Sequence, residues 1–290
     1  MTDLVYEAPG TVDEAVQALA AGGSGARIFA GGTDLLVQMH EEMIEPSTLV
    51  DIKNIAEARA VTIGDADIRI GAAVTGAELG EHQELKALLP GVVEAVELIG
   101  SYQVQGRATV GGNLCNASPA ADSVPALIAT DARALIAGAG GTREMAVADL
   151  LTGPGQTALA ADEFVVSLII AKPAARTADA YLRFIPRTEM DIAVVGAGVS
   201  LTIAEDGTCG AARLALGAVA PTARLVDAAS EALVGNTLDG AVLDKLAAAA
   251  SAACDPIDDK RGTIEFRTKV AGVLACRAAR IAWERAEKRS

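Results

Sequence analysis

Two glycine-rich stretches combine the residue types that bind phosphate. The first is Ala30-Gly31-Gly32-Thr33-Asp34-Leu35-Leu36, and the second runs from Thr109-Val110-Gly111-Gly112-Asn113 to Asp122. Paired glycines lack a Cβ, so backbone N–H groups can approach a ligand closely, and the neighbouring hydroxyl and amide side chains add donors. A single Gly-Gly pair more often only makes a turn, but each pair here follows an apolar run that resembles a β-strand. Together the two motifs predict a phosphate-binding site.

The cysteines and histidines do not form a metal-binding pattern. The four cysteines lie far apart, at Cys115, Cys209, Cys254 and Cys276. No Cys-x-x-Cys pair occurs, so the chain cannot supply the ligands of a zinc site or an iron–sulfur cluster. The histidines are His40 and His82, and the polar run around His82 predicts a solvated helix end rather than a metal site or a Ser-His-Asp triad. Any redox chemistry must therefore come from a bound cofactor.

Composition favours a globular protein with two domains of ordinary size. The 290 residues are 51% hydrophobic, much of it alanine, and no apolar run is as long as a membrane span. The formal charge of −14 argues against nucleic acid and anionic membrane surfaces as partners. The start, Met1-Thr2-Asp3-Leu4-Val5-Tyr6-Glu7, lacks the basic and apolar regions of a secretory leader, so we expect a cytoplasmic protein.

The first segment of the chain predicts strands and a helix around the first glycine motif. Thr11-Val12-Asp13-Glu14 has the form of a capping box. The helix that it starts would bury Val12, Ala15, Val16 and Leu19. Strands are expected at 26–30 and 48–52. The Gly-x-Gly-x-x-Gly fingerprint of a Rossmann unit is absent, because Thr-Asp-Leu-Leu follows Gly31-Gly32.

Strands followed by helices predict an α+β organisation for the rest of the chain. Pro90 opens a helix that stops near Gly100, and Pro125 lies near the start of another. Strands are expected at 68–70, 134–136, 164–170, 180–184, 192–203 and 213–219, and closing helices near 222–234, 238–253 and 262–287. A proline among polar residues at 172–177 predicts a domain boundary. The last helix repeats apolar residues, predicted to face the core, at Phe266, Val270, Val273, Leu274 and Ile281.

The sequence resembles the flavin-binding subunit of the molybdenum hydroxylases in its two glycine motifs, in their spacing and in the segment from Tyr181 to Ala193. This family contains xanthine dehydrogenase and aerobic carbon monoxide dehydrogenase. The segment Pro256–Arg267 resembles the family's Asp-x-Arg-Gly-x-x-x-(Tyr/Phe)-Arg signature, whose charges would fix a helix start or face a neighbouring subunit. The resemblance covers almost the whole chain. It implies an α+β fold: a two-part FAD-binding domain of the vanillyl-alcohol-oxidase/PCMH-like type over 1–175 (about 1–55 and 56–175), then a smaller α+β domain of antiparallel sheet and helices over 176–290.

The same resemblance implies the cofactor-binding residues. The flavin pyrophosphate would be wrapped by Ile28, Phe29, Ala30, Gly31, Gly32, Thr33, Asp34 and Leu35. Further contacts are implied at Thr109, Val110, Gly111, Gly112 and Asn113, and looser ones at Ile99 and Val165. Asp122 would accept hydrogen bonds from the sugar-like part of the cofactor, or instead cap the following helix. Arg183 would place a cation near the flavin, or instead be a surface arginine of a strand. No catalytic or metal-binding residue is predicted.

The resemblance implies an electron-transfer subunit. FAD, bound non-covalently, would accept electrons from 2Fe–2S clusters of a small iron–sulfur subunit and pass them to NAD, oxygen or a quinone. A large subunit with the molybdenum cofactor would hydroxylate the substrate, in a dimer of heterotrimers. The alternatives are a stand-alone FAD oxidase or reductase of the same superfamily, which the scarcity of His and Tyr disfavours, and a non-catalytic assembly protein. Substrate and acceptor stay open.

Overall fold

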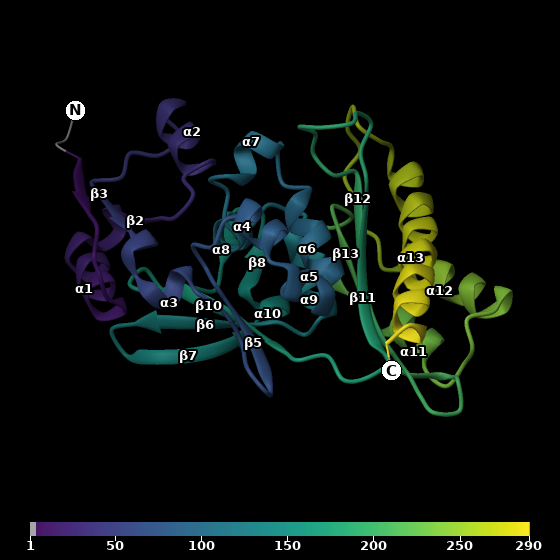
Figure 1. The fold of residues 1–290 in the computed structure, drawn as a ribbon. Helices are drawn as coiled ribbons and strands as arrows, with labels where there is room; N and C mark the ends of the chain where they lie inside the picture. Colours follow the sequence, from purple (N-terminus) through teal and green to yellow (C-terminus); the bar gives the residue numbers. More distant parts are fainter. Residues whose placement is uncertain (1–3, 290) are drawn as a thin grey trace.

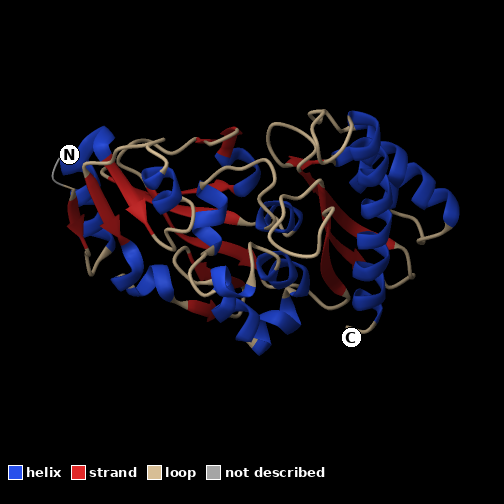
Figure 2. Cartoon of the chain, turned by 90° about the horizontal axis from the view of Figure 1, so that it is seen from above, coloured by secondary structure: helices blue, strands red, loops and turns tan. Residues whose placement is uncertain are grey.

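The computed structural model describes residues 4–289 and arranges them around three larger sheets in series, with a separate two-stranded sheet (Figure 1). Residues 1–3 of the predicted domain 1–175 and residue 290 of the predicted domain 176–290 lie outside the described part. Seen from above, the N-terminal and C-terminal sheets lie at opposite ends of the molecule (Figure 2). The predicted α+β class is confirmed.

The first sheet is small and parallel, with strand order β1-β3-β2. Its strands are β1 (Val5–Glu7), β2 (Ala26–Phe29) and β3 (Thr48–Asp51). The predicted capping box is confirmed, since Thr11 and Glu14 exchange hydrogen bonds at the start of α1 (Val12–Gly22). The short helix α2 (Leu35–His40) follows the first glycine motif, and none of its residues is buried.

The middle part is built on a five-stranded antiparallel sheet, in the order β4-β5-β10-β6-β7. Its strands are β4 (Val61–Ile63), β5 (Asp67–Gly71), β6 (Arg133–Gly138), β7 (Gly141–Ala146) and β10 (Phe164–Ala171). The pair β8 (Leu151–Gly153) and β9 (Gln156–Thr157) stands apart from it. The helices of this part are α3 (Ala56–Arg59), α4 (Gly76–Glu81), α5 (Gln83–Leu88), α6 (Pro90–Glu97), α7 (Tyr102–Gln105), α8 (Val110–Cys115), α9 (Ser123–Ala129) and α10 (Val147–Leu150).

The C-terminal part is a four-stranded antiparallel sheet between two layers of helices. The strands are β11 (Thr177–Phe184), β12 (Val195–Ile203), β13 (Cys209–Gly217) and β14 (Arg224–Leu225), paired in that order. The long helix α13 (Ile264–Glu287) lies along β11 and β12 and packs against α12 (Gly240–Ala252), which contacts α11 (Asp227–Leu233). On the opposite face lie α6 and α9 of the middle part (Figure 1).

Close backbone contact joins the middle and C-terminal parts. A Cβ on Gly91, in the first turn of α6, would stand 2.7 Å from the backbone of Ala180 on β11. Asp179 of β11 accepts a hydrogen bond from the backbone N–H of Val92 (2.9 Å), which satisfies one of the free donors at the start of α6. The two parts therefore meet along α6, whose C-terminal end leads to the predicted site residue Ile99.

Two local predictions are wrong. The second glycine motif does not follow a strand, because Ser101–Ala108 folds into the single turn of α7 and its flanking loop. The predicted stripe on α13 fails at Phe266 and Val273, which are 40% and 42% exposed. Alanines such as Ala271, Ala275, Ala278 and Ala282 face the core instead, because small side chains let α13 lie close to the sheet. Among the described helices, none is both long and apolar enough to cross a bilayer.

Candidate functional site

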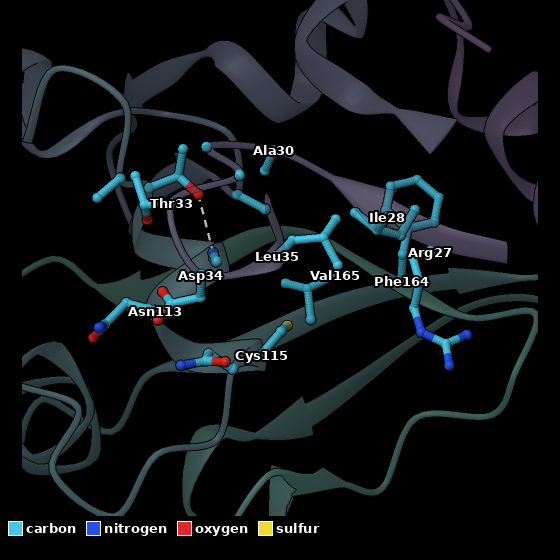
Figure 3. Close-up of a pocket in the computed structure, with 18 of the residues that line it drawn as sticks. Arg27, Ile28, Ala30, Thr33, Asp34, Leu35, Asn113, Cys115, Phe164 and Val165 are labelled. Carbon is cyan, nitrogen blue, oxygen red and sulfur yellow. Dashed lines mark hydrogen bonds between the residues drawn. The ribbon is translucent and has the colours of Figure 1, made fainter. Parts of the chain in front are cut away.

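A cavity of about 450 Å³ lies where the two glycine motifs meet, a volume in the range of cofactor sites. Polar Thr33, Asp34 and Asn113 stand at one end and Arg27 at the other, with Leu35, Val165 and Cys115 between them (Figure 3). Most of the predicted residues line this cavity: Ile28, Ala30, Gly31, Gly32, Thr33, Asp34, Leu35, Ile99, Thr109, Gly111, Gly112, Asn113 and Val165. The fold thus brings together positions 28–35, 99, 109–113 and 165.

The first glycine motif offers a run of free backbone donors. In the described chain, none of the N–H groups from Gly31 to Leu35 donates a hydrogen bond to a protein acceptor, and all five residues line the cavity. The chain can turn here because Gly32 has a positive φ of 73°. Consecutive N–H groups in such a turn form a concave site for an anion. The donor set of this loop therefore fits a phosphate group.

The backbone donors of the second motif are already used within the protein. The N–H groups of Val110 and Gly111 donate to the carbonyls of Val74 and Ala72, and that of Gly112 donates to the Thr109 hydroxyl (3.0 Å). A Cβ on Gly111 would lie 2.6 Å from the Ala72 carbonyl oxygen, so this glycine is required by packing. The second motif thus forms a wall of the cavity. The free amides of the first motif support close approach of a ligand there better than the bonded amides of the second motif do.

Burial and hydrogen bonds shift the pKa values of three acidic and thiol groups in the cavity. Burial raises the pKa of Asp34, whose carboxyl group makes no hydrogen bond within the described chain and stands beside the free amides. Burial also raises the pKa of the Cys115 thiol to about 12, so it is not a nucleophile at neutral pH. Glu163 lies at the cavity edge, and its hydrogen bonds to Arg143 lower its pKa. None of these groups is arranged as an acid–base pair.

Asp122 and Arg183 do not line the cavity but bind each other. Arg183 Nη1 donates to Asp122 Oδ2 and to the carbonyl of Leu98, each at 2.8 Å, and the Tyr181 hydroxyl donates to Asp122 Oδ1 at 2.9 Å. The two charged side chains are 9% and 6% exposed, respectively. Burial raises the pKa of Asp122 to about 6, against the opposing effect of Arg183 and Tyr181.

This pair contradicts the second alternative given for each residue, a helix-capping side chain at Asp122 and a surface arginine at Arg183. Asp122 stands at the N-cap position of α9, but its side chain makes no capping hydrogen bond there, and the side chain of Arg183 is not at the surface. The long side chain of Arg183 reaches Asp122 because β11 packs on α6 and α9. Through Leu98 the pair supports the wall at Ile99. Direct contact of either residue with a cofactor stays a prediction.

Two other predicted residues lie behind the cavity wall. The Phe29 ring packs beneath the glycine turn, with Cε2 2.3 Å from the position of a Cβ on Gly32. Val110 is fully buried in the core. Both shape the loops, and direct contact with a cofactor stays a prediction for them as well.

The sequence analysis missed part of the lining. The additional residues are Arg27, Gln38, Ile44, Ile52, Ala72, Ala108, Cys115, Asn116, Gly155, Leu159, Glu163 and Phe164. Helical spacing could have found Gln38, three residues after Leu35 on α2. Its side chain donates to Asn116 (3.3 Å) across the cavity rim. No local signal marks Gly155, Leu159 or Glu163, which only the tertiary fold brings here. Within residues 4–289 no cluster of His, Cys, Asp and Glu could hold a metal ion.

Comparison with known proteins gives the same assignment for both parts of the chain. Residues 2–173 match the family model described as "FAD binding domain in molybdopterin dehydrogenase", and residues 180–282 match "CO dehydrogenase flavoprotein C-terminal domain". The carbon monoxide dehydrogenase medium chain of Hydrogenophaga pseudoflava is 32% identical, over 97% of each chain. The nicotinate dehydrogenase FAD-subunit of Eubacterium barkeri is 31% identical, over 82% of each. A crystal structure of Cu,Mo-CO dehydrogenase superposes with a TM-score of 0.93 at 33% identity, over 97% of this chain and 98% of the other.

Proposed function

The chain belongs to the FAD-binding medium subunits of the molybdopterin dehydrogenases, the carbon monoxide and xanthine dehydrogenase family, and from this we propose that it relays electrons through FAD held in the cavity described above. It is an oxidoreductase subunit of this class. The observation that carries the proposal is the row of free N–H groups from Gly31 to Leu35 on the cavity wall. In the relay, electrons come from 2Fe–2S clusters of a partner and leave to NAD, oxygen or a quinone.

In this proposal the protein binds and orients FAD and takes no covalent part in the reaction. When bound, FAD supplies reversible electron storage. The amides of Gly31–Leu35 hold the pyrophosphate, with the Thr33 hydroxyl as an additional donor. Leu35, Ile99 and Val165 give an apolar wall that excludes water from the cofactor. The Asp122–Arg183 pair fixes the Leu98 carbonyl and with it the wall at Ile99.

The assembly that we propose supplies the other cofactors of the relay. An iron–sulfur small subunit brings the 2Fe–2S clusters, and a large subunit brings the molybdenum cofactor and the substrate site, in a dimer of heterotrimers. Support comes from relatives that are themselves named as chains or subunits of larger dehydrogenases. We further propose that the chain divides into an FAD-binding domain over 1–175 and a C-terminal domain over 176–290, in the cytoplasm.

A two-stage experiment tests this function. First, the purified chain is titrated with FAD and its visible spectrum is recorded, and an unchanged free-flavin spectrum would contradict the binding site. Second, the FAD-loaded chain is mixed anaerobically with the reduced iron–sulfur subunit expressed from a neighbouring gene. We expect rapid bleaching of the flavin absorbance, and no bleaching by an oxidised iron–sulfur subunit as the control. If the FAD of the loaded chain stays oxidised after mixing with the reduced partner, the relay is refuted, whereas FAD binding is not.

A further inference from the structure

Lys53 lies directly behind the first glycine motif, although it does not line the cavity. Its ammonium group donates to the Ala30 carbonyl (3.0 Å), pairs with Asp51 (2.8 Å) and stands over the Phe29 ring, 4.0 Å from the centroid. These three groups lie around the ammonium, which has three N–H donors. The side chain is 31% exposed, and these contacts restrain it.

The partner of Lys53 is itself held in place. Asp51, on β3, accepts hydrogen bonds from the Tyr6 hydroxyl of β1 and from the backbone N–H of Lys53 (2.9 Å). Burial opposes ionisation of this carboxyl, but the hydrogen bonds from Lys53 and Tyr6 outweigh it, and the pKa of Asp51 lies below its usual value. The charged pair is thus anchored to two neighbouring strands of the first sheet.

The contact at Ala30 controls the direction of the next N–H group. The Ala30 carbonyl and the Gly31 N–H belong to one peptide unit, which is trans, so they point in opposite directions. Lys53 holds the carbonyl from behind, and the Gly31 N–H consequently points away from Lys53, on the side where Gly31 lines the cavity. A hydrogen bond to the carbonyl also polarises the same amide and makes its N–H a stronger donor.

We propose that Lys53 is a positioning residue that aims and polarises the Gly31 amide toward the cofactor pyrophosphate. The surrounding loop is closely packed. A Cβ on Gly31 would stand 2.1 Å from the Arg107 carbonyl oxygen, and the Phe29 ring beneath Lys53 fills the space under Gly32. Lys53 thus connects the first sheet to the phosphate loop. This role rests on the proposed function, because it concerns the same cofactor site.

The test compares ligands with and without the pyrophosphate. Apoprotein is titrated with FAD, and ADP and adenosine are measured as competitors, for the wild-type chain and Lys53→Met. Methionine keeps the length of the side chain and removes the charge. We expect the affinity for FAD and ADP to fall about tenfold, as for loss of one charge-assisted hydrogen bond, and the affinity for adenosine to stay unchanged. Lys53→Arg keeps a cation that stacks on Phe29, so it should stay within about threefold of the wild type.

Two further variants make the result decisive. Lys172→Met is the matched control, because Lys172 also donates to a backbone carbonyl, that of Gly64 (3.1 Å), outside the cavity lining. It should change none of the three affinities. Tyr6→Phe removes only the hydroxyl that holds Asp51 and serves if Lys53→Met does not fold. We expect ADP to bind about threefold more weakly to it and adenosine equally well.

The outcomes separate the role of Lys53 from the function of the site. Two results would overturn the positioning role. In the first, Lys53→Met lowers the affinities for ADP and adenosine equally. In the second, the wild type binds both ligands and Lys53→Met changes neither affinity. A wild-type chain that binds neither FAD nor ADP refutes the proposed function itself. Selective loss of the two pyrophosphate ligands, with recovery in Lys53→Arg, supports the role that we propose.

Discussion

Replacement of Gly32 by alanine should weaken FAD binding by decades in addition to destabilising the fold. Gly32 has a φ of 73°, a left-handed conformation that costs a non-glycine residue about 1–2 kcal/mol. The added Cβ would stand 2.3 Å from Phe29 Cε2, so the ring must move, at a further cost of about 1–3 kcal/mol. Movement of this ring displaces the amides of Gly31 and Gly32. Loss of two hydrogen bonds to a charged phosphate costs about 3–6 kcal/mol, or two to four decades in affinity.

Gly235→Ala is the matched control for this prediction. Gly235 has a φ of 77°, and a Cβ there would meet no atom within 4 Å. It should lose only the conformational term of about 1–2 kcal/mol and bind FAD normally. Urea unfolding followed by the fluorescence of the single tryptophan, Trp283, gives the stability, and quenching of FAD fluorescence gives the affinity. Equal FAD affinity in the two alanine variants would refute the assignment of the first motif as the phosphate site.

Three further predictions concern the cofactor, the buried carboxyl and the activity. FAD should dissociate on acid precipitation, because the Cys115 thiol has a pKa of about 12 and stays protonated; yellow colour retained in the protein pellet would show covalent attachment. Asp122 has a native pKa of about 6 against 3.8 in the unfolded chain, so between these values the native state binds more protons and stability falls as pH rises. Acidification from pH 7 to pH 5 should therefore stabilise the wild type relative to Asp122→Asn by about 1 kcal/mol in urea titrations, and parallel pH profiles of the two would contradict this. The isolated FAD-loaded chain should not be bleached anaerobically by aldehydes, purines or other N-heterocycles, because residues 4–289 form no cluster that could hold a metal ion and the cavity presents no acid–base pair for C–H activation; rapid bleaching by any of them would favour a stand-alone oxidase.

The sequence by itself determined the two loops and most of the secondary structure, and its resemblance to a known family implied the cofactor. A Gly-Gly pair in an apolar context, the capping box at Thr11 and the proline at the start of α6 are local signals that depend on neighbouring residues only. The absence of patterned cysteines and the acidic composition are also sequence properties. Because such signals act through backbone conformation and solvation, they needed no tertiary contact to be interpreted.

Only the tertiary structure decided which groups of those loops are free. In the second motif the amides of Val110 and Gly111 donate to the segment before α4 and that of Gly112 to Thr109, whereas those of Gly31–Leu35 have no acceptor in the described chain. Asp122 and Arg183, 61 positions apart, neutralise each other because β11 packs on α6 and α9. Lys53 reaches Ala30 because β2 and β3 are parallel neighbours whose ends lie together. A hydrogen bond between distant residues depends on packing, and residue type and spacing cannot specify it.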